Sequence, residues 1–331
     1  RRQRQMCIRD RDYILNQFSK VKVNKMKPVI RNILRSAVYQ LKYMDSVPDS
    51  AVCNEAVKLA VKKGFGTLRG FVNGVLRNVA RGLDQVEYPT EGIERLSVVY
   101  SMPEWILKLW KKTYDLDVIE SMLQAFQEET PVTIRCNMAK TTPENLKESL
   151  QKEGVTVTPH PYLYYAFWIQ DYDHLSELES FQKGEFYVQD ISSMLVGELE
   201  DPKKGDRVID VCAAPGGKAL HVAEKLRGTG SVEARDLSLY KVGLITENIE
   251  RSGLTNIHAV QKDATVCDAD VKDAADLVIA DLPCSGLGVL AKKTDLKYKA
   301  TEQSTKELAG LQREILKNAA SYVRPGGTLI Y

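Results

Sequence analysis

The sequence has few residues that could build a metal centre or a disulfide framework. Its 331 residues include six cysteines and four histidines, no two cysteines form a CxxC pair, and the histidines are scattered. Zinc sites are normally built from such clusters, so we expect no metal. No hydrophobic core of a secretion signal is seen either. We therefore expect reduced thiols and a cytoplasmic protein.

The sequence also lacks a long hydrophobic run. No apolar stretch approaches the roughly 18 residues that cross a bilayer, so we expect no membrane partner. The hydrophobic content is 44% and the charged content is 27%, which is typical of a globular protein and excludes a disordered, collagenous or disulfide-dense chain. At roughly 100–200 residues per domain, the length predicts two or three domains.

The net charge of +2 is small, but it hides an uneven distribution. Residues 1–90 hold 18 Lys+Arg and 7 Asp+Glu, whereas residues 91–331 hold 28 and 37. A basic lobe of this kind is typical of contact with a polyanion, and a solvated basic helical face is the alternative. Residues 1–11 show no helical period, and we set them aside as a non-native or disordered tail. The stretch 12–90 remains basic without them.

The hydrophobic pattern changes twice along the chain. Residues 12–86 have apolar positions at three- and four-residue steps, which predicts an all-α domain. Residues 87–189 read as linker helices followed by a small α+β domain. From residue 190 to 331, strands and helices alternate, which predicts a parallel sheet with helices on both faces. The expected strands are 208–211, 231–235, 256–260, 277–280 and 328–331, and the expected helices are 218–227, 238–252 and 304–323.

The first strand of that alternation leads into a dense loop of small residues. Ligands of doubly wound sheets bind at the carboxyl ends of the strands, where such a loop lets them approach the backbone. The loop is neither G-x-G-x-x-G nor a P-loop, so a dinucleotide or a nucleoside triphosphate is poorly supported. The expected cofactor-binding loop consists of Cys212, Ala213, Ala214, Pro215, Gly216, Gly217 and Lys218.

Two aspartates follow the next two strands. Asp236 lies 26 positions after Asp210, where a carboxylate can accept hydrogen bonds from ribose hydroxyls. Asp263 follows the third strand and could bond the exocyclic amine of an adenine. Taken singly, each is more often a helix cap or turn residue. Together with the loop they favour an adenosine-bearing ligand without phosphates, S-adenosyl-L-methionine.

The fourth strand ends in a Pro283-Cys284 pair, which places a thiol at the same edge of the sheet. A buried structural cysteine is the alternative. Cytosine C5 is a poor nucleophile, but a thiolate that adds to C6 makes C5 reactive toward a sulfonium methyl group. Methylation of adenine N6 would favour a Pro-Pro-aromatic loop instead, and that loop is absent.

Three segments, DVCAAPGGK at 210–218, ADLPCSGLG at 280–288 and RPGGTLIY at 324–331, resemble the RNA 5-methylcytosine methyltransferases. Two more, LRSAVYQLKYMDSVP at 34–48 and GFVNGVLR at 70–77, resemble the NusB-like domain fused to one branch of that family. This branch, the Sun/Fmu type, methylates cytosine C5 in bacterial 16S ribosomal RNA. The resemblance implies a NusB-like helical RNA-binding domain, a small α+β RNA-recognition domain and a Rossmann-like S-adenosylmethionine-dependent methyltransferase domain.

The resemblance also implies roles for individual residues. The loop 212–218 would bind the methionine part of the cofactor. Asp236 would bind its ribose and Asp263 its adenine, and Asp281 would lie near the methyl donor and the target base. Cys284 would assist release of the methylated product. Arg135 and Asn137 would belong to an Arg-x-Asn motif facing RNA, Gln189-Asp190 would be the motif before the first strand, and Lys292 and Lys293 could contact the RNA backbone.

The nucleophile of that family lies in a Thr-Cys pair after the fifth strand. We therefore expect it beyond Tyr331, and we expect the chain to be a fragment, shortened at both ends, that makes little product. The expected partner is 16S ribosomal RNA, free or in an early assembly particle, and the expected state is a monomer. The alternatives are an RNA-binding ribosome-assembly factor with a scaffold methyltransferase fold, and a transfer-RNA cytosine-C5 methyltransferase.

Overall fold

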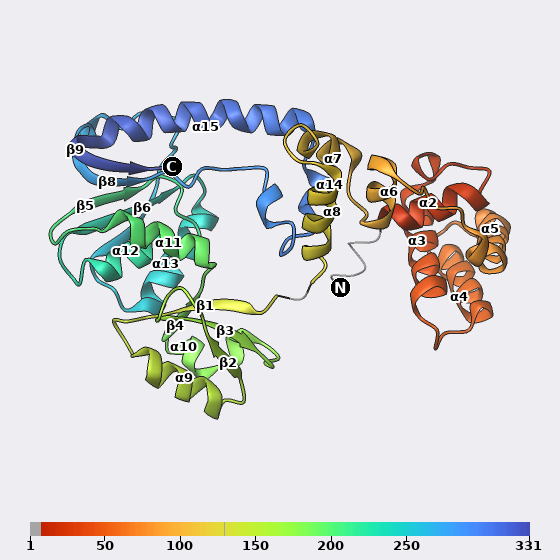
Figure 1. Cartoon of the computed structure of the whole chain (residues 1–331), viewed down its shortest axis with the longest axis horizontal. Coiled ribbons are helices and arrows are strands. Elements are labelled where there is room, and N and C mark those ends of the chain that lie inside the picture. Colours follow the sequence, from red (N-terminus) through yellow and green to blue (C-terminus); the bar gives the residue numbers. More distant parts are fainter. Residues whose placement is uncertain (1–7, 129) are drawn as a thin grey trace. The chain divides into compact units, whose positions relative to one another are not determined.

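The computed structural model describes residues 8–128 and 130–331. These residues divide into two compact units. The helical unit contains the described residues up to Glu128 together with Ser285–Ser304. The two-sheet unit contains the described residues from 130 to Cys284 together with Thr305–Tyr331. Figure 1 labels the elements of both units.

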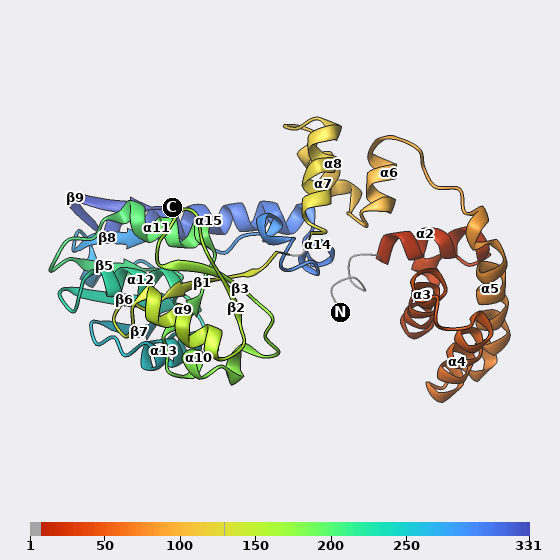
Figure 2. The ribbon, with the colours of Figure 1, turned by 60° about the horizontal axis from the view of Figure 1, so that its bottom comes forward.

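Four helices form the first part of the helical unit. They are α2 (Ile8–Phe18), α3 (Pro28–Tyr43), α4 (Asp49–Lys62) and α5 (Arg69–Gly82), and Figure 2 shows them gathered together. Each helix has apolar residues on one face, which is buried against its neighbours. The shared core includes Leu15, Leu34, Val38 and Leu76, all fully buried. The predicted all-α domain is confirmed.

The first described residues belong to this bundle and not to a tail. Helix α2 begins at Ile8, and the backbone N–H of Arg9 donates to Ser101 Oγ at 2.7 Å. Asp10 is buried and its carboxylate accepts hydrogen bonds from Tyr43 and Lys42. The prediction of a tail over residues 1–11 is therefore wrong for residues 8–11, because their partners lie far along the chain. Residues 1–7 of that prediction lie outside the described residues.

A second helical group completes the helical unit. It consists of α6 (Gly92–Val99), α7 (Glu104–Trp110), α8 (Leu116–Ala125) and the short α14 (Leu296–Lys299). Leu290 and Leu296 pack into the core that α6, α7 and α8 form, and Tyr298 Oη lies 2.9 Å from Ser101 Oγ. The segment Ser285–Ser304 therefore packs with the helical unit, although it falls within the range 190–331 that we assigned to the methyltransferase domain.

The two-sheet unit begins with an antiparallel sheet of four strands. Its elements are β1 (Val132–Cys136), α9 (Pro143–Lys152), β2 (Thr156–Pro159), β3 (Ala166–Gln170), α10 (Glu179–Gln182) and β4 (Phe186–Val188). The strand order β2-β3-β1-β4 with this succession of elements is the ferredoxin-like arrangement. The predicted α+β domain is confirmed. Strand β3 begins at Ala166, and Tyr162 and Tyr164 before it are exposed.

The second sheet of this unit is parallel. Its strands are β5 (Arg207–Asp210), β6 (Ser231–Asp236), β7 (Ile257–Gln261), β8 (Ala275–Ile279) and β9 (Val323–Ile330), in the order β7-β6-β5-β8-β9. The order reverses between β5 and β8, and ligands of such sheets bind at this switch point. The predicted Rossmann-like domain is confirmed.

Helices cover both faces of the parallel sheet (Figure 1). Helices α12 (Gly217–Lys225) and α13 (Leu239–Ser252) pack on one face, with Leu220 and Ile245 in the core. Helix α15 (Glu302–Tyr322) covers the other face through Ile315 and Ala319. A further helix, α11 (Ile191–Glu200), packs against α12 and was not predicted.

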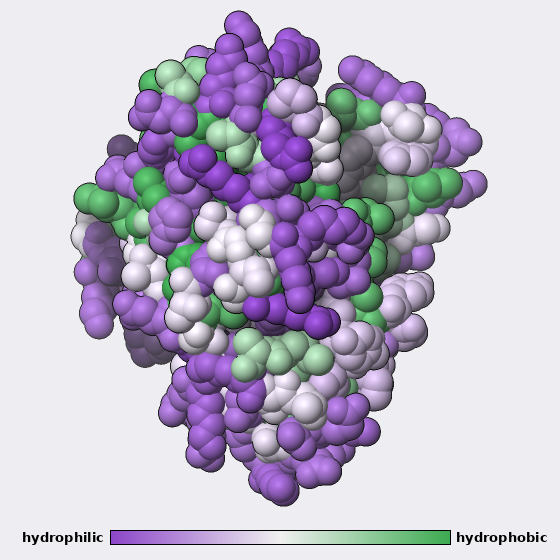
Figure 3. Space-filling model, turned by 90° about the vertical axis from the view of Figure 1, so that its left-hand side faces the viewer, coloured by the Kyte–Doolittle hydropathy of each residue, from purple (hydrophilic) through white to green (hydrophobic). Residues whose placement is uncertain are grey.

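No helix in the described part of the chain is both long and apolar enough to cross a membrane. The face of the molecule in Figure 3 is largely hydrophilic, with hydrophobic residues in scattered patches.

Candidate cofactor and catalytic site

A pocket opens at the switch point of the parallel sheet. Three segments line it: the end of β4 with the start of α11, the loop from β5 into α12, and the residue after β8. The switch point therefore brings together residues almost a hundred positions apart in the sequence. The lining residues are Val188, Gln189, Asp190, Ser193, Asp210, Cys212, Ala213, Ala214, Pro215, Gly217, Lys218 and Asp281.

Backbone hydrogen bonds hold the loop from β5 into α12 in a tight turn. The N–H of Ala213 donates to Arg235 O at 2.8 Å, and the N–H of Gly216 donates back to Ala213 O at 2.6 Å. Gly216 has a φ of +105°, a conformation that favours glycine, and α12 begins directly after it. The first turn of α12 thus faces the pocket, where its free N–H groups and dipole favour an anionic group.

Lys218 and Asp281 form an ion pair at the edge of the pocket. Lys218 Nζ lies 2.6 Å from Asp281 Oδ2, and the side chains are 20% and 58% exposed. One residue comes from the first turn of α12 and the other follows β8 by two positions. The predicted cofactor residues Cys212–Lys218 and Asp281 are thus brought together, with Gly216 shaping the turn without lining the pocket.

Asp236, Asp263 and Cys284 do not line this pocket. Asp236 is buried at the end of β6, where its carboxylate accepts from the N–H of Ala214 at 3.2 Å and pairs with Lys241 at 3.0 Å. Asp263 is exposed, and hydrogen bonds from Thr265 lower the pKa of its carboxyl group. Asp236 therefore supports the cofactor loop directly, while its contact with a ribose and that of Asp263 with an adenine stay predictions.

Two buried carboxyl groups interact with each other here: Asp210, which lines the pocket, and Glu200. Asp210 is 1% exposed, and burial raises its pKa to about 7, although the N–H of Cys212 donates to Oδ1. Glu200, at the end of α11, is 8% exposed, and burial together with the charge of Asp210 raises its pKa to about 8. Neither residue was singled out as a site residue from the sequence.

Burial separates the thiols of the described residues into two classes. It raises the pKa of Cys136 and of Cys212 to about 12, and it raises that of Cys53 as well, so these thiols stay protonated at neutral pH. Cys267 and Cys284 are exposed. Because the thiolate is the reactive form, Cys212 is a wall of the pocket and not a nucleophile. Cys7 lies outside the described residues.

The structure corrects the role expected for Arg135 and Asn137. Both side chains are fully buried, so the prediction that they contact RNA is wrong. Arg135 donates to Gln189 Oε1 at 2.7 Å and pairs with Glu224 at 3.0 Å. Asn137 donates to the carbonyl oxygens of Gly184 and Ser252. These bonds join the ferredoxin-like part to the parallel-sheet part within the two-sheet unit.

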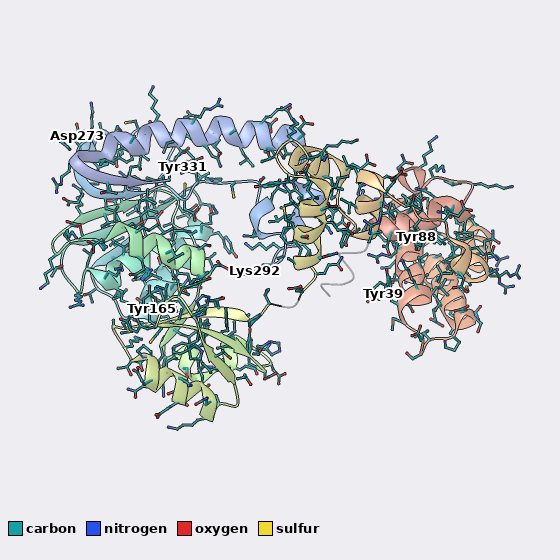
Figure 4. All side chains as sticks on the ribbon, in the orientation of Figure 1. Tyr39, Tyr88, Tyr165, Asp273, Lys292 and Tyr331 are labelled. Atoms are coloured by element: carbon teal, nitrogen blue, oxygen red, sulfur yellow. The ribbon has the colours of Figure 1, made fainter. Side chains whose placement is uncertain are left out.

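Lys292 and Lys293 lie in the segment Ser285–Ser304 of the helical unit, and both are exposed. Figure 4 labels Lys292 in this segment. Their expected contact with an RNA backbone stays a prediction. Within residues 8–128 and 130–331, no group of three or more His, Cys, Asp or Glu side chains is arranged to hold a metal ion.

Sequence profiles of three protein families match the chain. The NusB family matches residues 8–81, the ferredoxin-like domain of RsmF/B-like methyltransferases matches 102–172, and the 16S rRNA methyltransferase RsmB/F family matches 198–331. The probable ribosomal RNA small subunit methyltransferase B of Bacillus subtilis strain 168 is 37% identical over 322 residues, which are 97% of this chain and 72% of that relative. The chain belongs to the 16S rRNA methyltransferase RsmB/F family.

Further relatives and solved structures agree with this placement in the RsmB/F family. The ribosomal RNA small subunit methyltransferase B of Vibrio cholerae is 30% identical over 92% of this chain and 69% of its own. The crystal structure of PH0851 matches with a TM-score of 0.84 and 25% identity over 98% of this chain and 74% of its own. The crystal structure of NSun6 from Pyrococcus horikoshii with SFG, a cofactor analogue, matches with a TM-score of 0.63 and 25% identity. This match covers 69% of this chain and 82% of that chain.

Methyltransferases of the RsmB/F family use S-adenosyl-L-methionine, and the pocket fits this cofactor. When bound, the cofactor supplies a methyl group activated by a sulfonium centre. The pocket offers groups for both ends of an amino acid: Lys218 with the first turn of α12 for a carboxylate, and the acidic Asp281 and Asp210 for an ammonium group. The small side chains of the loop leave room beside the backbone.

The cofactor loop of this RsmB/F chain was predicted from the sequence, whereas Gln189-Asp190 was named only as the motif before the first strand, without a place in the pocket. Val188, Gln189, Asp190 and Ser193 line the pocket from β4 and α11. Asp190 caps α11 by accepting a hydrogen bond from the N–H of Ser192, and an aspartate before a hydrophobic run is the signal that could have revealed this helix.

Proposed function

We propose that the natural gene product containing this chain methylates C5 of a cytosine in small-subunit (16S) ribosomal RNA, with S-adenosyl-L-methionine as methyl donor. The observation that carries the proposal is the exposed thiol of Cys284, which follows Pro283 and comes three positions after the pocket residue Asp281. A thiol is the group that a C5-methylating enzyme needs beside its cofactor, because addition to C6 is what makes C5 nucleophilic.

In this mechanism one thiol adds to the base and a second thiol assists release of the product. One adds to C6 of the cytosine, forming a carbon–sulfur bond and making C5 nucleophilic. After C5 has gained the methyl group, a base removes its proton and the carbon–sulfur bond breaks, which restores the aromatic ring. We assign Cys284 to the release step, following the resemblance to the family. The nucleophile expected in a Thr-Cys pair after the fifth strand stays a prediction.

The basic helices α2–α5 supply an RNA-binding surface in this proposal. Lys20, Lys22, Lys25 and Lys27 are exposed within eight residues of the segment that joins α2 to α3. Two other cations of this region are paired with acids: Arg35 pairs with Asp12, and Lys42 pairs with Asp10. We take 16S ribosomal RNA, free or in an early assembly particle, as the partner because the relatives are named for the small-subunit RNA.

Cys284→Ala tests the proposal in the natural gene product. If Cys284 assists release, the variant should accumulate an RNA–protein complex that survives denaturing electrophoresis, and its turnover should fall. Cys267→Ala is the matched control, because Cys267 is also exposed but follows β7, whereas Cys284 follows β8 and the pocket residue Asp281. Wild-type turnover without a trapped complex in Cys284→Ala would remove Cys284 from the mechanism. Loss of both turnover and complex would make it the nucleophile and refute the release role.

A further inference from the structure

Amide side chains tie the loops that follow β5, β6, β7 and β8 at the carboxyl edge of the parallel sheet. In each case the amide nitrogen of an Asn or Gln outside the loop donates to a backbone carbonyl oxygen within it. The first three loops lie beside residues expected to bind the cofactor, and the fourth carries the Pro283-Cys284 pair. The bonds run from Asn248 to Pro215 at 2.9 Å, from Gln261 to Leu237 at 3.0 Å, from Asn318 to Ala264 at 3.0 Å and Thr265 at 2.8 Å, and from Gln312 to Pro283 at 2.8 Å.

The bond from Gln312 reaches the peptide group that joins Pro283 to Cys284. Gln312 lies on α15, and its Nε2 donates to Pro283 O. Because a peptide group is planar, holding that oxygen also holds the nitrogen and the Cα of the next residue, Cys284. Proline has no N–H, so its carbonyl oxygen is the backbone group through which a hydrogen bond can hold it. Gln312 therefore sets the orientation of the backbone from which the thiol projects.

The residue before the Pro283-Cys284 pair is anchored to the same helix. Leu282 is 7% exposed and shares a hydrophobic core with Leu311 and Ile315 of α15. The residues on either side of this anchor, Asp281 and the Pro283-Cys284 pair, are exposed. Helix α15 thus holds the loop twice, through the shared core at Leu282 and through the amide of Gln312, and leaves the thiol accessible to a ligand.

We propose that Gln312 is a positioning residue for Cys284 in the release of the methylated base. In that step a base takes the proton from C5, the electron pair of the C5–H bond forms the C5–C6 double bond, and the carbon–sulfur bond at C6 breaks with its pair on the leaving sulfur. A thiolate acts as this base only when it lies at C5, and a displacement of about 1 Å can lower a rate on the order of a hundredfold. The inference rests on the release role of Cys284 in the proposed function.

The test uses the natural gene product, small-subunit RNA and isotope-labelled S-adenosyl-L-methionine. Gln312→Met keeps the length of the side chain and removes the donor. It should lower kcat by roughly tenfold to a hundredfold and leave the KM for S-adenosyl-L-methionine unchanged. It should also accumulate the RNA–protein complex that survives denaturing electrophoresis. Gln312→Lys, which restores a donor, should recover part of the turnover.

Two further variants separate positioning from a general effect on the structure. Asn318→Leu is the matched control, because it breaks bonds of the same kind from the same helix, but to Ala264 and Thr265 in the loop after β7. It should trap no RNA. In the double variant Gln312→Met, Cys284→Ala, turnover should be no lower than in Cys284→Ala alone, because residues that act as a unit are not additive.

Wild-type turnover without a trapped complex in Gln312→Met, beside a Cys284→Ala variant that does trap RNA, would overturn the inference and leave the proposed function intact. An equal fold-loss from Gln312→Met with and without the thiol would make Gln312 merely structural and overturn the inference as well, as would RNA trapped by Asn318→Leu. Wild-type turnover in Cys284→Ala would instead refute the release role in the proposed function, and the inference with it.

Discussion

Glu200 gives a quantitative prediction about stability and pH. Its carboxyl group is buried at the end of α11, and neither oxygen has a hydrogen-bond partner among the described residues. Burial and the charge of Asp210 raise its pKa from 4.5 to about 8, against the opposing charges of Lys225 and Lys218. A folded-state pKa above the unfolded value means that the folded protein binds the proton more tightly. The contribution of Glu200 to stability is therefore greatest below pH 4.5 and is lost as the pH rises toward 8.

Glu200→Gln removes this ionisation and keeps the shape of the side chain. Between about pH 5 and pH 8, the gain in unfolding free energy over the unaltered chain should grow by about 1.4 kcal/mol per pH unit. It should therefore be roughly 3 kcal/mol larger at pH 7.5 than at pH 5 and level off above pH 8. The rise follows from the unfolded carboxyl being ionised throughout this range while the folded one is protonated.

The assay is urea unfolding of the two-sheet unit, followed by the fluorescence of Trp168 in a Trp105→Phe, Trp110→Phe background. This background is needed because Trp105 and Trp110 lie in the helical unit. Glu198→Gln is the control: burial alone would raise the pKa of Glu198, but hydrogen bonds from Tyr165 and Lys225 lower it. Its effect on stability should be constant over pH 5–8. If the difference in unfolding free energy between Glu200→Gln and the unaltered chain did not change over pH 5–8, the assignment of a buried, protonated carboxyl group would be refuted.

Two further predictions concern packing and RNA binding. Gly184→Ala should destabilise the two-sheet unit by at least about 2 kcal/mol, because φ is +71° and a Cβ atom would collide with the Arg251 carbonyl oxygen. Gly154→Ala is the control: φ is +83° but no atom lies near the added Cβ atom, so it should cost about 1 kcal/mol. Equal effects in urea unfolding would contradict the clash. Replacing Lys20, Lys22, Lys25 and Lys27 by Gln should reduce the slope of log affinity against log salt for RNA by about 3 and leave cofactor affinity unchanged. An unchanged slope would show that these lysines do not contact phosphates.

The parallel sheet and its cofactor loop could be predicted from the sequence because their signals are local. Each buried strand is a short apolar run, and each ends in residues whose chemistry is plain, such as the small residues of 212–218. Since carboxyl ends of parallel strands meet at one edge, Lys218 and Asp281 could be expected together although they are 63 positions apart.

The remaining features depend on pairings that no local pattern reveals. The resemblance to the family implied an RNA-facing role for Arg135, yet its side chain is buried, paired with Glu224 and hydrogen-bonded to Gln189. The segment Ser285–Ser304 follows a strand end directly, but its leucines complete the core of α6–α8. Residues 8–11 look erratic in sequence because their partners, such as Ser101, lie about ninety positions away.

The most direct test of the central claim is nucleoside analysis of ribosomal RNA. Small-subunit RNA from a strain lacking its own small-subunit methyltransferase B would be incubated with the natural gene product and isotope-labelled S-adenosyl-L-methionine, then digested and separated by mass spectrometry. We predict one labelled product, 5-methylcytidine, in the small-subunit RNA and none in transfer RNA. Label in another nucleoside, or in transfer RNA alone, would contradict the account.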